Sequence, residues 1–115
     1  IAEDEESNFK FLDMVIRKTN AQLLWAKTGL EAVQYCRDNQ HIDLILMDIK
    51  MPEMDGIEAI KEIRKSLKEL PIVVQTAFSM PEDRHMCINA GANDFIPKPI
   101  GTEKLLTIID KYMKE

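Results

Sequence analysis

Acids, a hydroxyl and an amine stand directly after short apolar runs of this sequence. The positions are Glu3 and Asp4 near the start, Asp48 after Leu-Ile-Leu-Met, Thr76 after Ile-Val-Val-Gln, and Lys98 after Phe-Ile-Pro. A carboxylate at the end of a core segment needs a charged or hydrogen-bonding partner, because burying it unpaired is costly. Three neighbouring carboxylates repel one another and favour a divalent cation with hard oxygen ligands, Mg²⁺ or Mn²⁺. A metal beside Lys98 would suit an anion with several oxygens, and a phosphoryl group fits.

These side chains converge only if the apolar runs are strands of one sheet. Strand-like segments occupy residues 1–2, 22–26, 44–47, 71–75 and 94–96, and helix-start signals or helical periodicity mark 5–18, 28–39, 55–67, 79–91 and 102–113. Parallel strands need crossover connections, so this alternation predicts an α/β fold with a five-stranded, doubly wound parallel sheet and five covering helices. Functional groups of such open sheets gather at the carboxyl ends of the strands.

Each polar residue taken alone also has an ordinary structural explanation. Thr76 suits a turn, a lysine beside prolines suits a solvated loop, and acids favour the first turn of a helix. The interpretation as one site depends on all four groups lying at the same predicted edge with complementary charges.

Composition narrows the class of protein. The 115 residues predict one domain, residues 1–115, with no internal repeat or linker. The net charge of −5 argues against direct nucleic-acid binding, and no apolar run approaches the roughly 18 residues that a membrane span needs. With no signal peptide, we expect a cytoplasmic location. Cys36 and Cys87 are 51 residues apart without metal-ligand spacing, which favours two reduced core thiols.

The ordered set of motifs resembles the receiver domain of bacterial two-component response regulators over essentially the whole chain. The residues that carry the resemblance are Glu3-Asp4, Asp48 with Met51-Pro52 and Asp55-Gly56, Thr76-Ala77, Phe95, and Lys98-Pro99. Each motif is weakly specific, whereas the ordered set is highly specific. The resemblance implies a flavodoxin-like sheet with strand order 2-1-3-4-5.

The resemblance also implies a role for each site residue. Asp48 is the expected acceptor of a phosphoryl group from phosphohistidine. Asp4, Asp48 and the backbone carbonyl of Lys50 are the expected ligands of Mg²⁺, with Glu3 acting directly or through water. A receiver of this kind catalyses its own phosphorylation and dephosphorylation but is not a metabolic enzyme.

Lys98 and Thr76 are expected to reorganise around the phosphoryl oxygens, because the modified carboxylate carries about −2 charge. Movement of Thr76 would open space for Phe95, the expected rotameric switch, and change the face formed by the fourth helix, fifth strand and last helix. Many family members carry Tyr at this position. Phe95 lacks the hydroxyl, so a readout through that hydrogen bond is not expected here.

The expected partner is the helical bundle of a histidine kinase or a histidine phosphotransfer domain. A core stripe of Phe9, Leu12 and Ile16 in the first helix predicts that Phe11 faces outward. Across the crevice, Ile100 supplies a second apolar group, so we interpret Phe11 and Ile100 as a docking footprint. The sequence carries no signal for the oligomeric state.

Only two residues precede Glu3, which would leave the first strand truncated. We interpret this start as favouring the receiver of a hybrid histidine kinase, with a stand-alone regulator or a transcription-factor fragment as alternatives. Three other functions share parts of this pattern. A flavin-binding module needs a different first loop, and an Asp-x-Asp phosphohydrolase needs its nucleophile after the first strand. A degenerate receiver that acts as a phosphorylation-independent interaction module is the strongest rival.

Overall fold

A parallel sheet forms the centre of the protein. The structure, a computed structural model, describes residues 1–19, 23–38, 42–49, 51, 53–76, 81–98 and 101–113. Among these residues the sheet has three parallel strands in the order β1-β2-β3: β1 (Ile45–Asp48), β2 (Ile72–Thr76) and β3 (Asp94–Pro97). The register places Asp48 opposite Gln75, and Gln75 opposite Ile96 on the other side.

The predicted first and second strands are present as single bridges rather than as strands. Ala2 forms one parallel bridge with Ala26 and another with Met47. Ladder-like hydrogen bonds join them, since the Glu3 amide donates to the Ala26 carbonyl at 2.8 Å and the Asp48 amide to the Ala2 carbonyl at 3.0 Å. A strand requires successive bridges, and among the described residues of these two segments only Ala2 and Ala26 form bridges. The five-strand order 2-1-3-4-5 is therefore not confirmed.

Five helices follow the predicted ranges closely in the described part of the chain. They are α1 (Glu6–Arg17), α2 (Gly29–Asp38), α3 (Gly56–Arg64), α4 (Pro81–Ala90) and α5 (Thr102–Met113). The predicted caps are confirmed: the Thr28 hydroxyl accepts from the Glu31 amide at 3.0 Å, and Asp55 accepts from the Glu58 amide at 2.9 Å. None of these described helices has the length and apolar character needed to cross a membrane.

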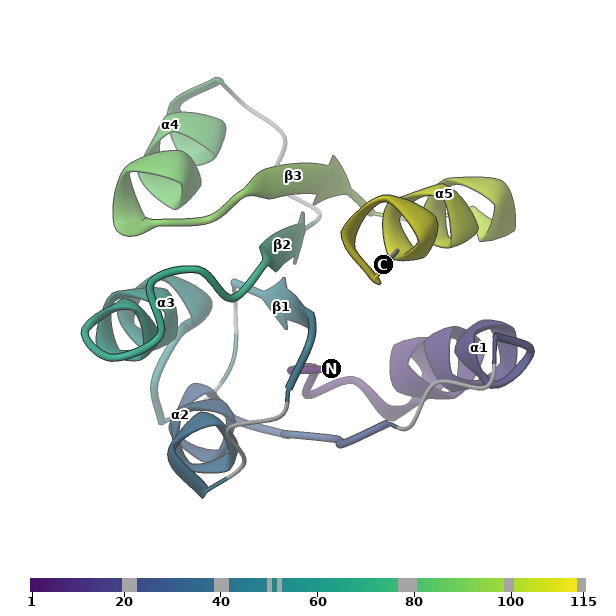
Figure 1. The fold of residues 1–115 in the computed structure, drawn as a ribbon, viewed down its shortest axis with the longest axis horizontal. Helices are drawn as coiled ribbons and strands as arrows, with labels where there is room; N and C mark the ends of the chain where they lie inside the picture. The colour runs from purple at the N-terminus through teal and green to yellow at the C-terminus, as the bar shows by residue number, and fades with distance from the viewer. Residues whose placement is uncertain are drawn as a thin grey trace.

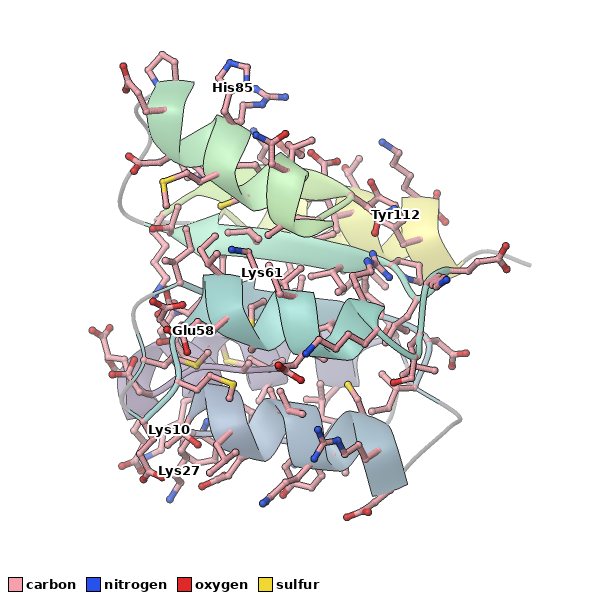
Figure 2. All side chains as sticks on the ribbon, turned by 90° about the vertical axis from the view of Figure 1, so that its left-hand side faces the viewer. Lys10, Lys27, Glu58, Lys61, His85 and Tyr112 are labelled. Carbon is pink, nitrogen blue, oxygen red and sulfur yellow. The ribbon has the colours of Figure 1, made fainter. Side chains whose placement is uncertain are left out.

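The helices cover the sheet as two layers. Helices α1 and α5 lie on one face, and α2, α3 and α4 lie on the other (Figure 1). Alternating strand residues divide the core accordingly, with Val73 on the α1/α5 side and Val74 on the α2–α4 side. Seen from that second layer, the three helices run side by side, with Lys27 and Glu58 at the end where α2 and α3 begin (Figure 2). The predicted thiols Cys36 and Cys87 are both buried and free.

Helix α4 ends where the sequence predicts, at a glycine. Gly91 has a φ of +122°, a backbone conformation that is strained for any residue with a side chain. Arg64 of α3 holds this turn, because its guanidinium donates to the Gly91 carbonyl at 2.8 Å and to Asn93 Oδ1 at 2.7 Å. This contact anchors the end of the sheet opposite to the acidic residues.

Candidate functional site

Three carboxylates meet at the carboxyl end of the sheet. Glu3 and Asp4 come from the segment beside β1, and Asp48 is the last residue of β1. One oxygen from each lies within 4.8 Å of the others. Glu3 is fully buried and Asp48 nearly so, while Asp4 is exposed. Such a cluster of hard oxygen ligands, open on one side to solvent, suits Mg²⁺ or Mn²⁺, which retain bound waters.

Lys98 joins two of these acids. It follows β3, where its amide donates to the Thr76 carbonyl at 2.7 Å. Its ammonium nitrogen lies 3.0 Å from Asp48 Oδ2 and 3.0 Å from Glu3 Oε1. The sequence-predicted convergence of lysine and acids is therefore present, and the structure shows that one amine is shared between two carboxylates.

The two carboxylates that share Lys98 are electrostatically unequal. Burial raises the pKa of Asp48 to about 6; the hydrogen bond from Lys98 opposes this rise and the charge of Glu3 adds to it. Burial also acts to raise the pKa of Glu3, but hydrogen bonds from Asn8 and Lys98 outweigh it and hold this pKa below its ordinary value. In the metal-free site the charged form is therefore disfavoured at Asp48 and favoured at Glu3.

A close turn supports the end of β1. The Gly56 amide donates to the Ile49 carbonyl at 2.7 Å, which holds the start of α3 against the end of β1. A Cβ atom on Gly56 would lie 2.2 Å from the Asp48 carbonyl oxygen, so this approach requires glycine. The Asp55-Gly56 motif thus caps α3 and also lets the start of that helix pack against the site.

Thr76 and Phe95 lie on a common face of the sheet. Val74 is paired with Phe95 in the register, and Thr76 follows Val74 by two residues, so all three side chains share the α2–α4 side. Thr76 is buried, and Phe95 is half-buried against the core of that side. The predicted switch residues are thus neighbours in the sheet.

Glu3 has further partners that the sequence interpretation missed. The Asn8 amide nitrogen donates to Glu3 Oε1 in a short contact and lies 3.5 Å from Gln75 Oε1. The Trp25 indole donates to the Glu3 carbonyl at 2.7 Å, and its ring stacks on Phe9 with centroids 4.0 Å apart. Gln75, a polar residue directly after three apolar residues of β2, was the available sequence signal for these polar contacts around Glu3.

Three predicted site residues need comment. Phe11 does not face outward, because it is half-buried and packs against the α1/α5 core; the outward prediction is wrong since α5 covers more of α1 than the stripe implied. Phe9, predicted in that stripe, is itself half-buried and lies against Trp25. Lys50 and Ile100 lie outside the described residues.

Comparison with known proteins agrees with this geometry. Residues 1–110 match the family model of the response regulator receiver domain. The chain is 34% identical to the polar-differentiation response regulator DivK of Brucella ovis, over 98% of this chain and 93% of that protein.

Solved structures show the same fold. The receiver domain of a sensor histidine kinase from Pseudomonas aeruginosa PAO1, crystallised with a magnesium ion in its active site cleft, is 29% identical with a TM-score of 0.90, covering 99% of this chain and 94% of that one. A putative response regulator from Chloroflexus aurantiacus is 27% identical with a TM-score of 0.91 and the same coverage. With five helices around a parallel sheet and a family match over nearly its whole length, the chain belongs to the response regulator receiver domains of two-component signalling.

Proposed function

We propose that this receiver takes a phosphoryl group from phosphohistidine onto Asp48. The observation that carries the proposal is the position of Lys98, whose ammonium lies 3.0 Å from Asp48 within the cluster of three carboxylates. A lone aspartate at a strand end would need only local hydrogen bonds. A buried acid paired with a shared lysine beside two further acids instead suits the binding of a metal and an anion together.

The transfer is a displacement at phosphorus. A carboxylate oxygen of Asp48 forms the new P–O bond as the P–N bond breaks, and the electron pair of that bond leaves with the donor imidazole, which takes a proton from solvent. The Lys98 ammonium, which contacts Asp48 Oδ2 at 3.0 Å, would then form its ion pair with the phosphoryl oxygens as negative charge moves onto them. Glu3, Asp4 and Asp48 would hold Mg²⁺, with the Lys50 carbonyl as a proposed further ligand; when bound, the ion neutralises charge on the transferring oxygens.

The raised pKa of Asp48 fits this role only if a cation is present. Without metal, burial raises this pKa to about 6, so the carboxylate is poorly suited to stay charged in acidic solution. A divalent ion beside it would favour the charged, nucleophilic form. The site is thus arranged so that metal binding and readiness for attack are linked.

We further propose that Thr76 and Phe95 transmit the change. The Thr76 hydroxyl would turn toward the phosphoryl oxygens, and Phe95 would take the space that it leaves on the same face. Residue 94 already connects β3 to α5, because the Tyr112 hydroxyl donates to Asp94 Oδ2 at 3.2 Å. The face formed by α4, β3 and α5 is therefore the proposed output surface.

The proposed partner is a histidine kinase or a phosphotransfer protein, the classes with which receiver domains of two-component systems interact. The similarity to the receiver of a sensor histidine kinase supports a hybrid kinase as the parent. Ile100 remains the proposed docking residue, whereas Phe11 packs against the α1/α5 core and is not proposed again as an outward-facing contact. Ile100→Asp should slow transfer from a phosphohistidine protein and spare phosphorylation by acetyl phosphate. Equal slowing with both donors would assign Ile100 to the site or the fold.

Intact mass after incubation with acetyl phosphate tests the function. We expect one phosphoryl adduct on the wild-type protein with Mg²⁺, and none after full removal of the metal or in Asp48→Asn. An adduct that persists in Asp48→Asn would contradict the assignment. No adduct under any condition would favour the degenerate receiver that acts as an interaction module.

A further inference from the structure

A buried glutamine lies beside the acidic site. Gln75 is fully buried on β2, directly beside Asp48 in the register. Its Oε1 lies 3.5 Å from Asn8 Nδ2. Its Nε2 is buried and has no hydrogen-bond partner among the described residues.

Neighbouring groups determine which way this amide points. Asn8 Nδ2 lies against the carboxylate of Glu3, which can only accept when ionised, so that atom must be the nitrogen of Asn8. Gln75 must then present its oxygen to Asn8, since the reverse would bring two donors together. The Nε2 of Gln75 is left without an acceptor by this arrangement and not by an amide assigned the wrong way round.

Stability alone does not account for Gln75. A buried donor without an acceptor is destabilising, and an apolar residue of similar shape would relieve that penalty. The 3.5 Å contact to Asn8 is at the long limit of a hydrogen bond and adds little. Val73, the other β2 residue on this side of the sheet, is apolar. The amide is therefore better explained by a second state of the site in which its spare N–H is used.

Glu3 is the acceptor that changes between states. In the structure it shares the Lys98 ammonium with Asp48, at 3.0 Å from each. If Lys98 turned toward a phosphoryl group on Asp48, Glu3, which is fully buried in the structure, would lose a donor. Asn8 touches both Glu3 and Gln75, so the Gln75 amide lies one side chain away from that carboxylate.

We propose that Gln75 is a positioning residue for the phosphorylated state, in which its spare amide donor turns to the side-chain oxygen of Asn8 and so holds the Asn8 nitrogen on Glu3 after Lys98 has moved to the phosphoryl oxygens. This inference rests on the proposed function, because it requires a phosphoryl group at Asp48. The contact between Asn8 and Gln75 would then contribute little to the unmodified protein and more to the phosphorylated one.

The test is the Gln75→Met variant, which keeps the approximate size of the side chain and removes the amide. Three quantities are measured: the midpoint of urea unfolding, the dissociation constant for Mg²⁺ alone, and the dissociation constant for beryllofluoride, a phosphoryl mimic, at saturating Mg²⁺. We expect an unfolding midpoint equal to or above that of wild type, Mg²⁺ affinity within about threefold, and beryllofluoride affinity weaker by about tenfold, as for loss of a buried hydrogen bond.

Val73→Ala is the matched control, because it opens space on the same strand and the same side of the sheet without touching the polar contacts around Glu3. It should lower the unfolding midpoint and leave beryllofluoride affinity unchanged. Beryllofluoride affinity of Gln75→Met within about threefold of wild type would overturn the inference. An equal loss of Mg²⁺ and beryllofluoride affinity would also overturn it, since Gln75 would then serve both states. A wild-type protein that binds Mg²⁺ but no beryllofluoride would overturn the proposed function, and this inference with it.

Discussion

Replacing Asp48, the proposed phosphoryl acceptor, should stabilise the metal-free protein. Burial and Glu3 raise the pKa of Asp48 from 3.8 to about 6. A difference of about 2 pKa units corresponds to about 3 kcal/mol of unfavourable free energy for the charged form at neutral pH. Asp48→Asn removes this charge but also weakens the bond that Lys98 makes at 3.0 Å, so we expect the free energy of unfolding to rise by about 1–3 kcal/mol.

The effect should depend on pH in a defined direction. The folded protein binds the proton of Asp48 more tightly than the unfolded chain does, because its pKa is raised on folding. The stability that Asp48 contributes is therefore complete below about pH 4 and is lost as the pH rises through about 6. The advantage of Asp48→Asn over wild type should be largest above about pH 7 and should shrink toward pH 4.

Urea unfolding in a chelating buffer at several pH values measures this difference. Asp110→Asn is the matched control, since it removes one negative charge from the exposed side of α5. The control should show no comparable gain. Mg²⁺ should then stabilise wild type more than Asp48→Asn, because it binds the folded form through that carboxylate. A destabilised Asp48→Asn variant, or a gain that does not vary with pH, would refute the electrostatic reasoning.

Three further predictions follow from individual contacts. Lys98→Met should lower the free energy of unfolding in metal-free buffer by about 3 kcal/mol, because two buried acids lose their cation, and adding Asp48→Asn should restore most of it. A double variant no more stable than Lys98→Met would contradict this. Gly91→Ala should lower the free energy of unfolding by about 1–3 kcal/mol, since the φ of Gly91 is +122°. Gly101→Ala should be nearly neutral in the same urea measurement, because no described atom lies within 4 Å of a new Cβ there. Equal effects of the two substitutions would contradict the backbone strain at Gly91. Fluorescence of Trp25 should change when Mg²⁺ is added, because its indole donates to the Glu3 carbonyl. An unchanged wild-type spectrum, or a fluorescence change that persists in Trp25→Phe, would contradict a connection between Trp25 and the metal site.

The main site residues were predictable because their positions depend on local patterns. An apolar run that ends in an acid places Asp48 at a strand end whatever surrounds it, and the same holds for Thr76 and Lys98. The helix starts were predictable for the same reason, since Thr28 and Asp55 act on amides three residues away. Patterns of this kind need no knowledge of tertiary packing.

The parts that were missed depend on contacts between distant segments. Asn8 and Gln75 are 67 residues apart in the chain, and neither carries a signal for the other. The half-buried position of Phe11 depends on how α5 packs over α1, which the periodicity of one helix does not determine. Among the described residues the number of strands differed because Ala2 forms only isolated bridges, one with Ala26 and one with Met47.

Chemical mapping of the phosphorylated residue tests the central claim most directly. The protein is phosphorylated with a phosphohistidine donor and Mg²⁺, reduced with borohydride, which converts an acyl phosphate of aspartate to homoserine, and sequenced by peptide mass spectrometry. The account predicts homoserine at position 48, dependent on both donor and metal. Homoserine at Asp4 or Asp55 in place of Asp48, or formation of the same product without metal, would contradict it.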